Sequence, residues 1–193
     1  MKSVLISINP KWCELIASGK KTVEVRKTRP HISPPFKVYI YCTKPPRGRA
    51  NMYDAFGFGD NAVEYGGKVM GEFICNKIED LHEFILEPRN KYEQQTIDEI
   101  LKASCLSFGE LCEYLNEREY YKPFYIWHIS SLVIYEKPKE LYDFVSYNKH
   151  EVCLQKNCFS GDCWGCPNNA IMVRPPQSWC YVKAIPDIKN DND

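Results

Sequence analysis

Residues 19–26 have the sequence Gly-Lys-Lys-Thr-Val-Glu-Val-Arg, a pattern typical of an extended strand with two chemically different faces. Alternate side chains of a strand point to opposite sides, so the two valines are expected to enter a core. Thr22, Glu24 and Arg26, with Lys20 one step earlier, are expected on the other side. Such a row of charges and a hydroxyl is costly anywhere except at a surface or a polar cleft. The segment is therefore a predicted strand and the first candidate site.

The residues before this strand predict a strand followed by a short helix. Residues 2–8 alternate in polarity and favour an extended segment. Asn9 is a suitable N-cap for a helix over 9–18, and Pro10 suits its first position. Gly19 is expected to end this helix in a left-handed conformation.

The rest of the chain predicts more strands than helices. Further strands are expected at residues 21–28, 36–43, 68–78, 123–135 (two strands or one bent strand) and 179–185, and further helices at 93–103, 107–116 and 139–145. Apolar helix faces are predicted for Cys13, Ile16 and Ala17, and for Phe108, Leu111, Cys112 and Leu115 behind the cap Ser107. Residues 44–67 form a predicted long loop. This pattern favours a small barrel with excursions.

Four residues of the first segment carry a resemblance to a known family. Gly19, Lys21, Glu24 and Arg26 match the G-x-K-x-x-E-x-R signature of the ASCH domain, a relative of the PUA fold. The Trp-His-Ile sequence at residues 127–129 also resembles that family.

The resemblance spans most of residues 1–145 and resumes near Arg174. It implies an α+β fold: a PUA-like mixed β-barrel with flanking helices, here with a Cys-rich insertion. The expected division is a barrel at 1–147, an insertion at 148–170, a last strand at 171–186 and a tail at 187–193. The family resembles small barrels that handle RNA or nucleosides, and one bacterial branch resembles an amidohydrolase of N4-acetylcytidine.

Composition excludes several classes of protein. The chain has 193 residues, which suits one domain of about 100–200 residues with an insertion. Lys and Arg together number 25, as do Asp and Glu, so the basic excess typical of proteins that coat long double-stranded DNA is missing. A small basic pocket remains compatible with this balance. The sequence contains no secretory signal and no apolar run near the roughly 20 residues of a membrane helix, so a cytoplasmic protein without a membrane partner is expected.

A cysteine cluster predicts a structural zinc site. The four cysteines have the spacing C-x4-C-x4-C-x2-C and lie at Cys153, Cys158, Cys163 and Cys166. Four thiolates separated by turn-rich sequence suit tetrahedral Zn²⁺, which would supply the folding free energy of a segment poor in apolar residues. An iron–sulfur cluster, two disulfides or four thiols are the alternatives. The other cysteines lie in apolar patterns and are expected to be core thiols: Cys13, Cys42, Cys75, Cys105, Cys112 and Cys180.

The candidate catalytic residues are Lys21, Glu24 and Thr22. A desolvated lysine acts as a base, a carboxylate carries a proton, and a hydroxyl serves as a nucleophile or donor. The amidohydrolase branch implies a Lys, a Thr and a Glu working together. Here Thr22 directly follows the lysine, and Glu24 occupies a place where that branch has Thr. Strict alternation also puts Lys21 opposite Glu24, so Lys21 would have to bend inward.

The candidate ligand-binding residues come from several predicted elements. They are Lys11, Trp12, Arg26, Glu72, His128 and Ser178. All of these except Lys11 also have a structural interpretation. Glu24 and Arg26 form a surface ion pair, Trp12 is a core residue and Glu72 a solvated strand residue, His128 supports the strand, and the segment at Ser178 is a rigid turn.

The sequence therefore supports three functions. The first is binding of RNA or a modified nucleoside, with bases stacked on aromatic side chains while Lys21 and Arg26 hold a phosphate or base edge. The second is hydrolysis of an amide on an N-acylated pyrimidine nucleoside, with Lys21 and Glu24 as the acid–base pair. The third is a protein-interaction module that uses the cysteine insertion.

Overall fold

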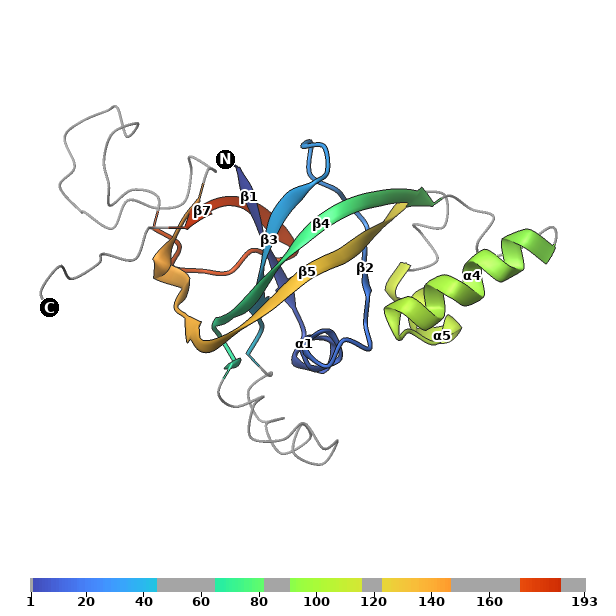
Figure 1. Cartoon of the computed structure of the whole chain (residues 1–193), viewed down its shortest axis with the longest axis horizontal. Coiled ribbons are helices and arrows are strands. Elements are labelled where there is room, and N and C mark those ends of the chain that lie inside the picture. The colour runs from blue at the N-terminus through green and yellow to red at the C-terminus, as the bar shows by residue number, and fades with distance from the viewer. Residues whose placement is uncertain (1, 45–64, 82–90, 116–122, 147–170, 185–193) are drawn as a thin grey trace, which may run out of the picture. The chain divides into compact units, whose positions relative to one another are not determined.

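The structure is a computed structural model that describes residues 2–44, 65–81, 91–115, 123–146 and 171–184. In chain order its elements are β1 (Ser3–Ile8), α1 (Pro10–Ala17), β2 (Val23–Arg26), β3 (Phe36–Cys42), β4 (Val69–Leu81), α4 (Lys91–Ser104), α5 (Phe108–Leu115), β5 (Phe124–Lys139), the 3-10 helix η3 (Leu141–Asp143), β6 (Phe144–Ser146) and β7 (Trp179–Ala184) (Figure 1). The fold class is α+β, as predicted. None of the described helices has the length and apolar composition needed to span a membrane.

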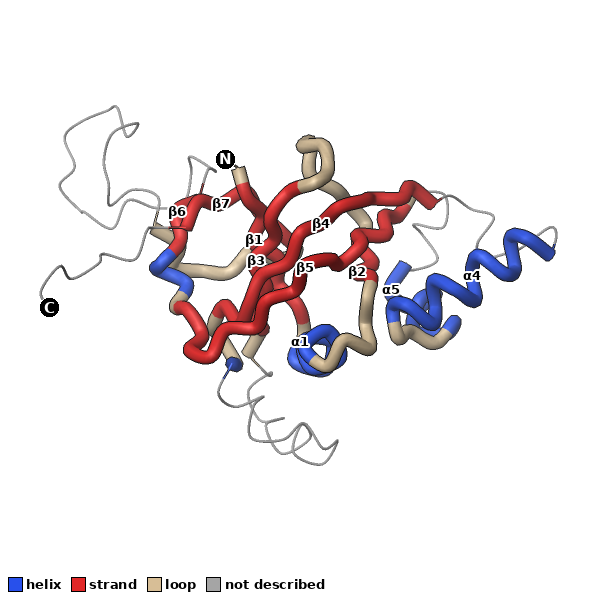
Figure 2. Tube along the Cα trace, in the orientation of Figure 1, coloured by secondary structure: helices blue, strands red, loops and turns tan. Residues whose placement is uncertain are grey.

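One seven-stranded sheet contains all the described strands, in the order β2-β5-β4-β3-β1-β7-β6 (Figure 2). Strand β1 is buried along its whole length because it lies between two others, parallel to β3 and antiparallel to β7. Among the described residues, β2 and β6 are the two edge strands and the sheet does not close. Closure into a barrel therefore stays a prediction.

The chain forms two compact units. The first unit comprises Met1–Pro10, Val38–Gly71 and Tyr135–Asp193, and the second comprises Lys11–Lys37 and Glu72–Ile134. Each has an apolar cluster of its own. That of the first unit contains Leu5, Tyr39, Tyr41, Val69, Leu141, Phe144, Met172, Cys180 and Val182. That of the second contains Val23, Val25, Leu81, Ile97, Leu111, Leu115, Phe124 and Ile126.

Most predicted elements are present, with shifted ends, and one is of a different type. The predicted strand 123–135 is the single strand β5, in which Ser131 has a left-handed backbone with φ 48°. The helix predicted at 139–145 is wrong. A single 3-10 turn, η3, is followed by β6, which pairs with β7 and buries Phe144 in the first unit's cluster. The apolar residues of this segment therefore serve a strand, because the neighbouring strand supplies hydrogen-bond partners that a sequence window cannot reveal.

Two predicted helix faces need correction. Ala17 of α1 is exposed, whereas Cys13 and Ile16 are buried as predicted. Phe108, the first residue of α5, is 44% exposed, whereas Leu111 and Leu115 are buried.

The six cysteines in the described part of the chain are thiols. Cys13, Cys42, Cys75 and Cys180 are buried, as predicted, and the remaining two are half-buried. The cluster of Cys153, Cys158, Cys163 and Cys166 lies outside the described residues, as does the predicted boundary at 147/148. The zinc site and this domain boundary stay predictions.

Candidate functional site

Strand β2 is buried on both faces, and the two faces differ in chemistry. Val23 and Val25 are 4% and 5% exposed and belong to the apolar cluster that includes residues of α4 and α5. Glu24 and Arg26 alternate with them and are 6% and 8% exposed. Glu24 pairs in register with the fully buried Trp127 of β5, so their side chains share one face. The predicted alternation of β2 is confirmed, but the polar face is as buried as the apolar one.

The end of α1 sets the position of Lys21. Gly19 has φ 72°, a left-handed conformation that suits glycine, and its N–H donates to the Ile16 carbonyl at 2.9 Å. The Lys21 N–H then donates back to the Leu15 carbonyl at 2.9 Å. Because β2 begins only at Val23, Lys21 precedes the alternating segment, and this turn directs its side chain inward.

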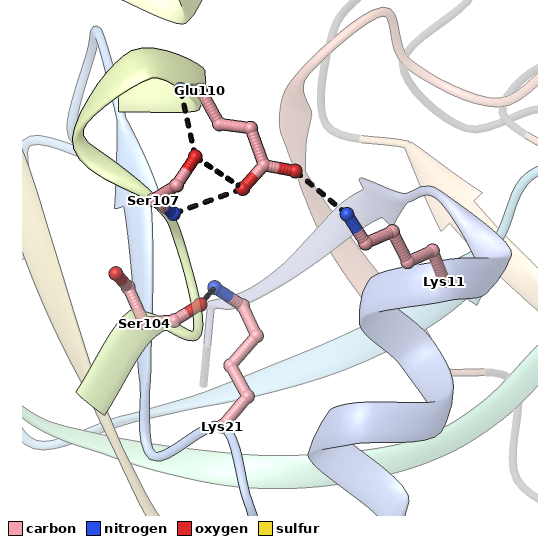
Figure 3. Close-up of polar contacts among 5 residues, drawn as sticks. All are labelled: Lys11, Lys21, Ser104, Ser107 and Glu110. Carbon is pink, nitrogen blue, oxygen red and sulfur yellow. Dashed lines mark hydrogen bonds and ion pairs between the residues drawn. The ribbon is translucent and has the colours of Figure 1, made fainter. Parts of the chain in front are cut away.

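Lys21, Glu24 and Arg26 form a buried ion-pair triad. The Lys21 Nζ lies 3.2 Å from Glu24 Oε2, and Arg26 Nη2 lies 3.0 Å from Glu24 Oε1. The side chains of Lys21, Glu24 and Arg26 are 3%, 8% and 10% exposed, respectively. Lys21 also donates at 2.8 Å to the carbonyl of Ser104, the last residue of α4 (Figure 3). The triad therefore carries one net positive charge, and a helix C-terminus, where cations are favourable, lies next to it.

These contacts fix the position of the Lys21 amino group. A carboxylate oxygen and a backbone carbonyl lie within hydrogen-bond distance of its Nζ. The Trp12 ring adds to this environment, because its centroid lies 5.2 Å from the Lys21 Nζ. Lys21 is thus placed to hold negative charge or an acceptor atom.

A second ion pair lies next to the triad and is open to solvent. Lys11 of α1 donates to Glu110 Oε1 of α5 at 2.7 Å, and its Nζ lies 4.2 Å from the Trp12 ring centroid. Glu110 Oε2 also accepts from the backbone N–H and the hydroxyl of Ser107, while the Glu110 N–H donates to that hydroxyl (Figure 3). This is a capping box, which confirms Ser107 as the cap of α5. The hydrogen bonds from Lys11 and from Ser107 lower the pKa of Glu110 to about 2.

Two residues predicted to share the face of Glu24 and Arg26 are not buried with them. Lys20 and Thr22 are exposed, whereas Lys21 between them is buried. The backbone of Thr22 is fixed, since its N–H donates to the Ala103 carbonyl and its carbonyl accepts from the Ile129 N–H. Lys20 and Thr22 therefore differ from the triad in exposure, and β2 starts after them.

Two other predicted ligand-binding residues have contacts of their own. Glu72 forms an ion pair with Lys37 of β3. His128 bonds through its Nε2 to Glu79 of β4. Burial opposes ionisation of Glu79, but hydrogen bonds from Lys77 and His128 outweigh it and lower the pKa of Glu79. These contacts support the structural interpretation of Glu72 and His128.

The first unit holds Ser178 and a separate cavity. The Ser178 carbonyl accepts from the Ser7 N–H at 2.9 Å, which fixes the turn before β7. The cavity has a volume of about 650 Å³, and its lining includes Tyr41, Glu140 and Tyr142. Of the predicted site residues that the structure describes, none contributes to this lining.

Three contributors to the site were missed from the sequence. The Ser104 carbonyl is a backbone group, so no residue type indicates it. Glu110 stands three residues after Ser107, and this S-x-x-E spacing was a readable capping signal. Trp127, which shares the face of Glu24, packs edge-on against Phe36 with ring centroids 5.9 Å apart, and the sequence indicates this role only through a family-like motif.

Comparison with known families places this geometry in context. The model of the ASCH domain matches residues 6–126 of the chain. The chain belongs to the ASCH domain family. The ASCH signature residues Lys21, Glu24 and Arg26 are those of the buried triad, and the signature glycine is the helix cap at Gly19.

Solved ASCH structures share the fold. The ASCH protein from Zymomonas mobilis is 15% identical with a TM-score of 0.50, over 94% of this chain and 87% of that chain. A serine-to-alanine variant of the same protein is 16% identical with a TM-score of 0.55, over 94% of this chain and 88% of that chain. At these identities the likeness concerns the fold alone. No curated protein matches the chain.

Proposed function

We propose that this ASCH protein binds RNA or a modified nucleoside beside β2, at the charged face formed by Lys21, Glu24 and Arg26 together with Trp12. The observation that carries the proposal is the burial of three charged side chains in one ion-paired row, with side-chain exposures between 3% and 10%. Family membership supports it, since ASCH domains resemble proteins that handle RNA or nucleosides.

The energetics of the triad favour a functional origin. Removing three charges from water costs several kcal/mol for each ion, and buried ion pairs recover this cost only in part. Apolar side chains of similar size would serve stability as well or better. A row of buried charges with a net positive charge is therefore better explained by recognition of an anionic or polar ligand than by folding.

Trp12 supplies the aromatic part of the proposed site. Its side chain is half-buried, and both Lys11 and Lys21 lie against its ring. RNA-binding proteins combine stacking on aromatic rings with cations that contact phosphates or base edges. Lys11, on the solvent side with 44% of its side chain exposed, is placed for a phosphate, while Lys21 is placed deeper.

Calorimetric titration with cytidine, N4-acetylcytidine and tetrauridylate tests the proposal. We expect Trp12→Phe to retain binding and Trp12→Leu to lose about 1–3 kcal/mol of it, the value of one stacked base. Lys21→Met keeps the Glu24–Arg26 pair and should also weaken binding. If Trp12→Leu and Lys21→Met bound all ligands as tightly as the wild-type protein, with folding verified by thermal melting, this site would be refuted.

The amidohydrolase remains the second candidate because Lys21 Nζ lies only 3.2 Å from Glu24 Oε2, within reach of proton exchange. The exposed position of Thr22 gives that reaction no hydroxyl beside the pair. Release of cytidine and acetate from N4-acetylcytidine, lost in Lys21→Met, would establish hydrolysis. Binding without release would leave the binding function.

We also propose that Cys153, Cys158, Cys163 and Cys166 hold one structural Zn²⁺. The spacing of these four thiols is the support, since the segment lies outside the described residues. Elemental analysis should find close to one zinc per chain, and the double variant Cys163→Ser/Cys166→Ser should lose it while most of the thermal transition remains. Metal-free protein with these cysteines in disulfides would refute the site. The protein-interaction alternative depends on the same segment.

A further inference from the structure

A second aromatic side chain with a cation over it lies on the face of β2 that carries the triad. Arg26 pairs in register with Tyr125 of β5, so the Tyr125 ring shares the face of Glu24 and Arg26. The Arg29 guanidinium carbon lies 5.6 Å from the centroid of that ring. Tyr125 is half-buried, and the side chain of Arg29 is 49% exposed.

Side-chain contacts on this face run from Trp12 to Arg26, and a register pair of β2 and β5 extends this series to Tyr125. Lys21 lies against Trp12 at one end, and its ion pair with Glu24 continues through the Glu24–Arg26 pair. Arg26 then leads through its register partner to the Tyr125 ring. All these residues belong to the second unit.

The series has an aromatic ring with an associated cation at each end, Trp12 with Lys11 and Tyr125 with Arg29. Residues on one face of a strand repeat about every 7 Å, and three charged side chains separate the two rings. One base cannot contact both rings, whereas consecutive bases of a single strand can. Guanidinium planes and aromatic rings are both surfaces on which unpaired bases stack.

We infer that Tyr125 and Arg29 form a second base-stacking position, so that the ligand of this face is a single-stranded oligonucleotide of at least two nucleotides. This inference rests on the proposed function and extends it. Bases stack at Trp12 and on the Arg29 guanidinium backed by Tyr125, while the intervening cations face the backbone between them. Asp80 holds Arg29 in place through an ion pair at 3.4 Å.

The chain offers a matched control for this position. Lys27 lies over the Tyr114 ring of α5 at 5.2 Å, a cation–aromatic pair of the same kind. It lies on the side of the helices, because α5 packs against the valine face of β2. Lys27→Ala therefore removes one cation next to an aromatic ring without touching the proposed series.

The test compares uridine, diuridylate and tetrauridylate by titration calorimetry. In wild type, affinity should rise at least tenfold from uridine to diuridylate. Arg29→Ala and Tyr125→Leu should each weaken the affinity for diuridylate and tetrauridylate by roughly tenfold and leave the affinity for uridine within twofold of wild type. Tyr125→Phe keeps an aromatic ring and should therefore bind the oligonucleotides as wild type does. Lys27→Ala should change none of the three affinities by more than twofold.

The salt dependence gives an independent readout. Because Arg29 stacks on a base while the intervening cations face the backbone, Arg29→Ala should leave the slope of log K against log salt for tetrauridylate nearly unchanged; a decrease of about 0.7 would assign Arg29 to a phosphate and overturn the stacking position.

The outcomes separate the inference from the proposed function. If Arg29→Ala and Tyr125→Leu leave oligonucleotide affinity unchanged while Trp12→Leu weakens it, the second position is refuted and the first stands. If Trp12→Leu changes no affinity, the proposed function itself is refuted. Equal losses for uridine and tetrauridylate in Arg29→Ala would also overturn the second position, since they indicate a general effect on the fold.

Discussion

The two faces of β2 are almost equally buried, yet their side chains differ in every other respect. Val23 and Val25 are 4% and 5% exposed against the apolar cluster of α4 and α5. Glu24 and Arg26 are 6% and 8% exposed, with Lys21 between the ends of two helices. Burial alone therefore does not distinguish a core from a site. The difference lies in whether the removal of water stabilises the folded state.

On the valine face, removal of water is itself stabilising, at about 25 cal/mol for each Å² of apolar surface. On the charged face it is costly and must be offset by ion pairs and hydrogen bonds. The two faces should consequently respond in opposite ways to apolar substitution. Four predictions test this comparison, from the largest expected effect to the smallest.

The largest effect is expected for Glu24→Ala. The substitution leaves Lys21 and Arg26 as two buried cations without their shared carboxylate, which should lower the free energy of unfolding by about 3–5 kcal/mol. Urea denaturation measures this change. Glu14→Ala removes an exposed carboxylate from α1 and should change stability by less than about 0.5 kcal/mol. If the free energy of unfolding of Glu24→Ala lay within about 1 kcal/mol of the wild-type value, Glu24 would not be needed to stabilise the charges of Lys21 and Arg26.

An apolar replacement of the whole triad should have the opposite sign. The triple variant Lys21→Met/Glu24→Leu/Arg26→Met should keep the wild-type stability or exceed it by about 1–4 kcal/mol, because no charge is left buried. It should also lose binding of tetrauridylate. Denaturation and titration on the same preparation check both. If the triple variant were less stable than Glu24→Ala, the triad would be shown to stabilise the fold.

On the valine face, Val25→Ala should lower stability by about 2 kcal/mol. Two lost methyl groups account for about 1.6 kcal/mol, and the cavity left behind adds to this value. Binding of tetrauridylate should stay unchanged, since this side chain points to the helices. Val133→Ala, at a position 50% exposed, is the matched control and should cost less than about 0.5 kcal/mol. If Val25→Ala also weakened tetrauridylate binding, the two faces of β2 would not differ in function.

The smallest effect concerns the exposed pair of Lys11 and Glu110. A double-mutant cycle with Lys11→Met and Glu110→Gln should give a coupling of only about 0.2–1 kcal/mol, because both side chains are more than a third exposed. The folded-state pKa of Glu110 lies below its ordinary value of 4.5, at about 2. The coupling should therefore be complete above pH 4.5 and disappear as the pH falls through about 2. A coupling that persists below that pH would contradict this origin.

Local sequence determined much of this protein. The alternation of residues 23–26, the cap at Gly19, the helix start at Pro10 and the cap at Ser107 each depend on neighbouring residues only, and each is present in the structure. The signature of Lys21, Glu24 and Arg26 also indicates the family from the sequence alone. Such features are predictable because their energies arise within a few residues of the chain.

The tertiary structure decided the rest, because it depends on partners far away in the chain. Lys21, and not Lys20, is buried beside Glu24 because β2 begins only at Val23 and because the Ser104 carbonyl, 83 residues away, accepts a hydrogen bond from Lys21. The segment after β5 became a strand because β7 was there to pair with it. Whether Glu24 and Arg26 lie in water or in a buried triad was decided by Trp127, which shares their face, and by the turn that brings Lys21 to Glu24. Alternation along a strand carries no information about what covers each face.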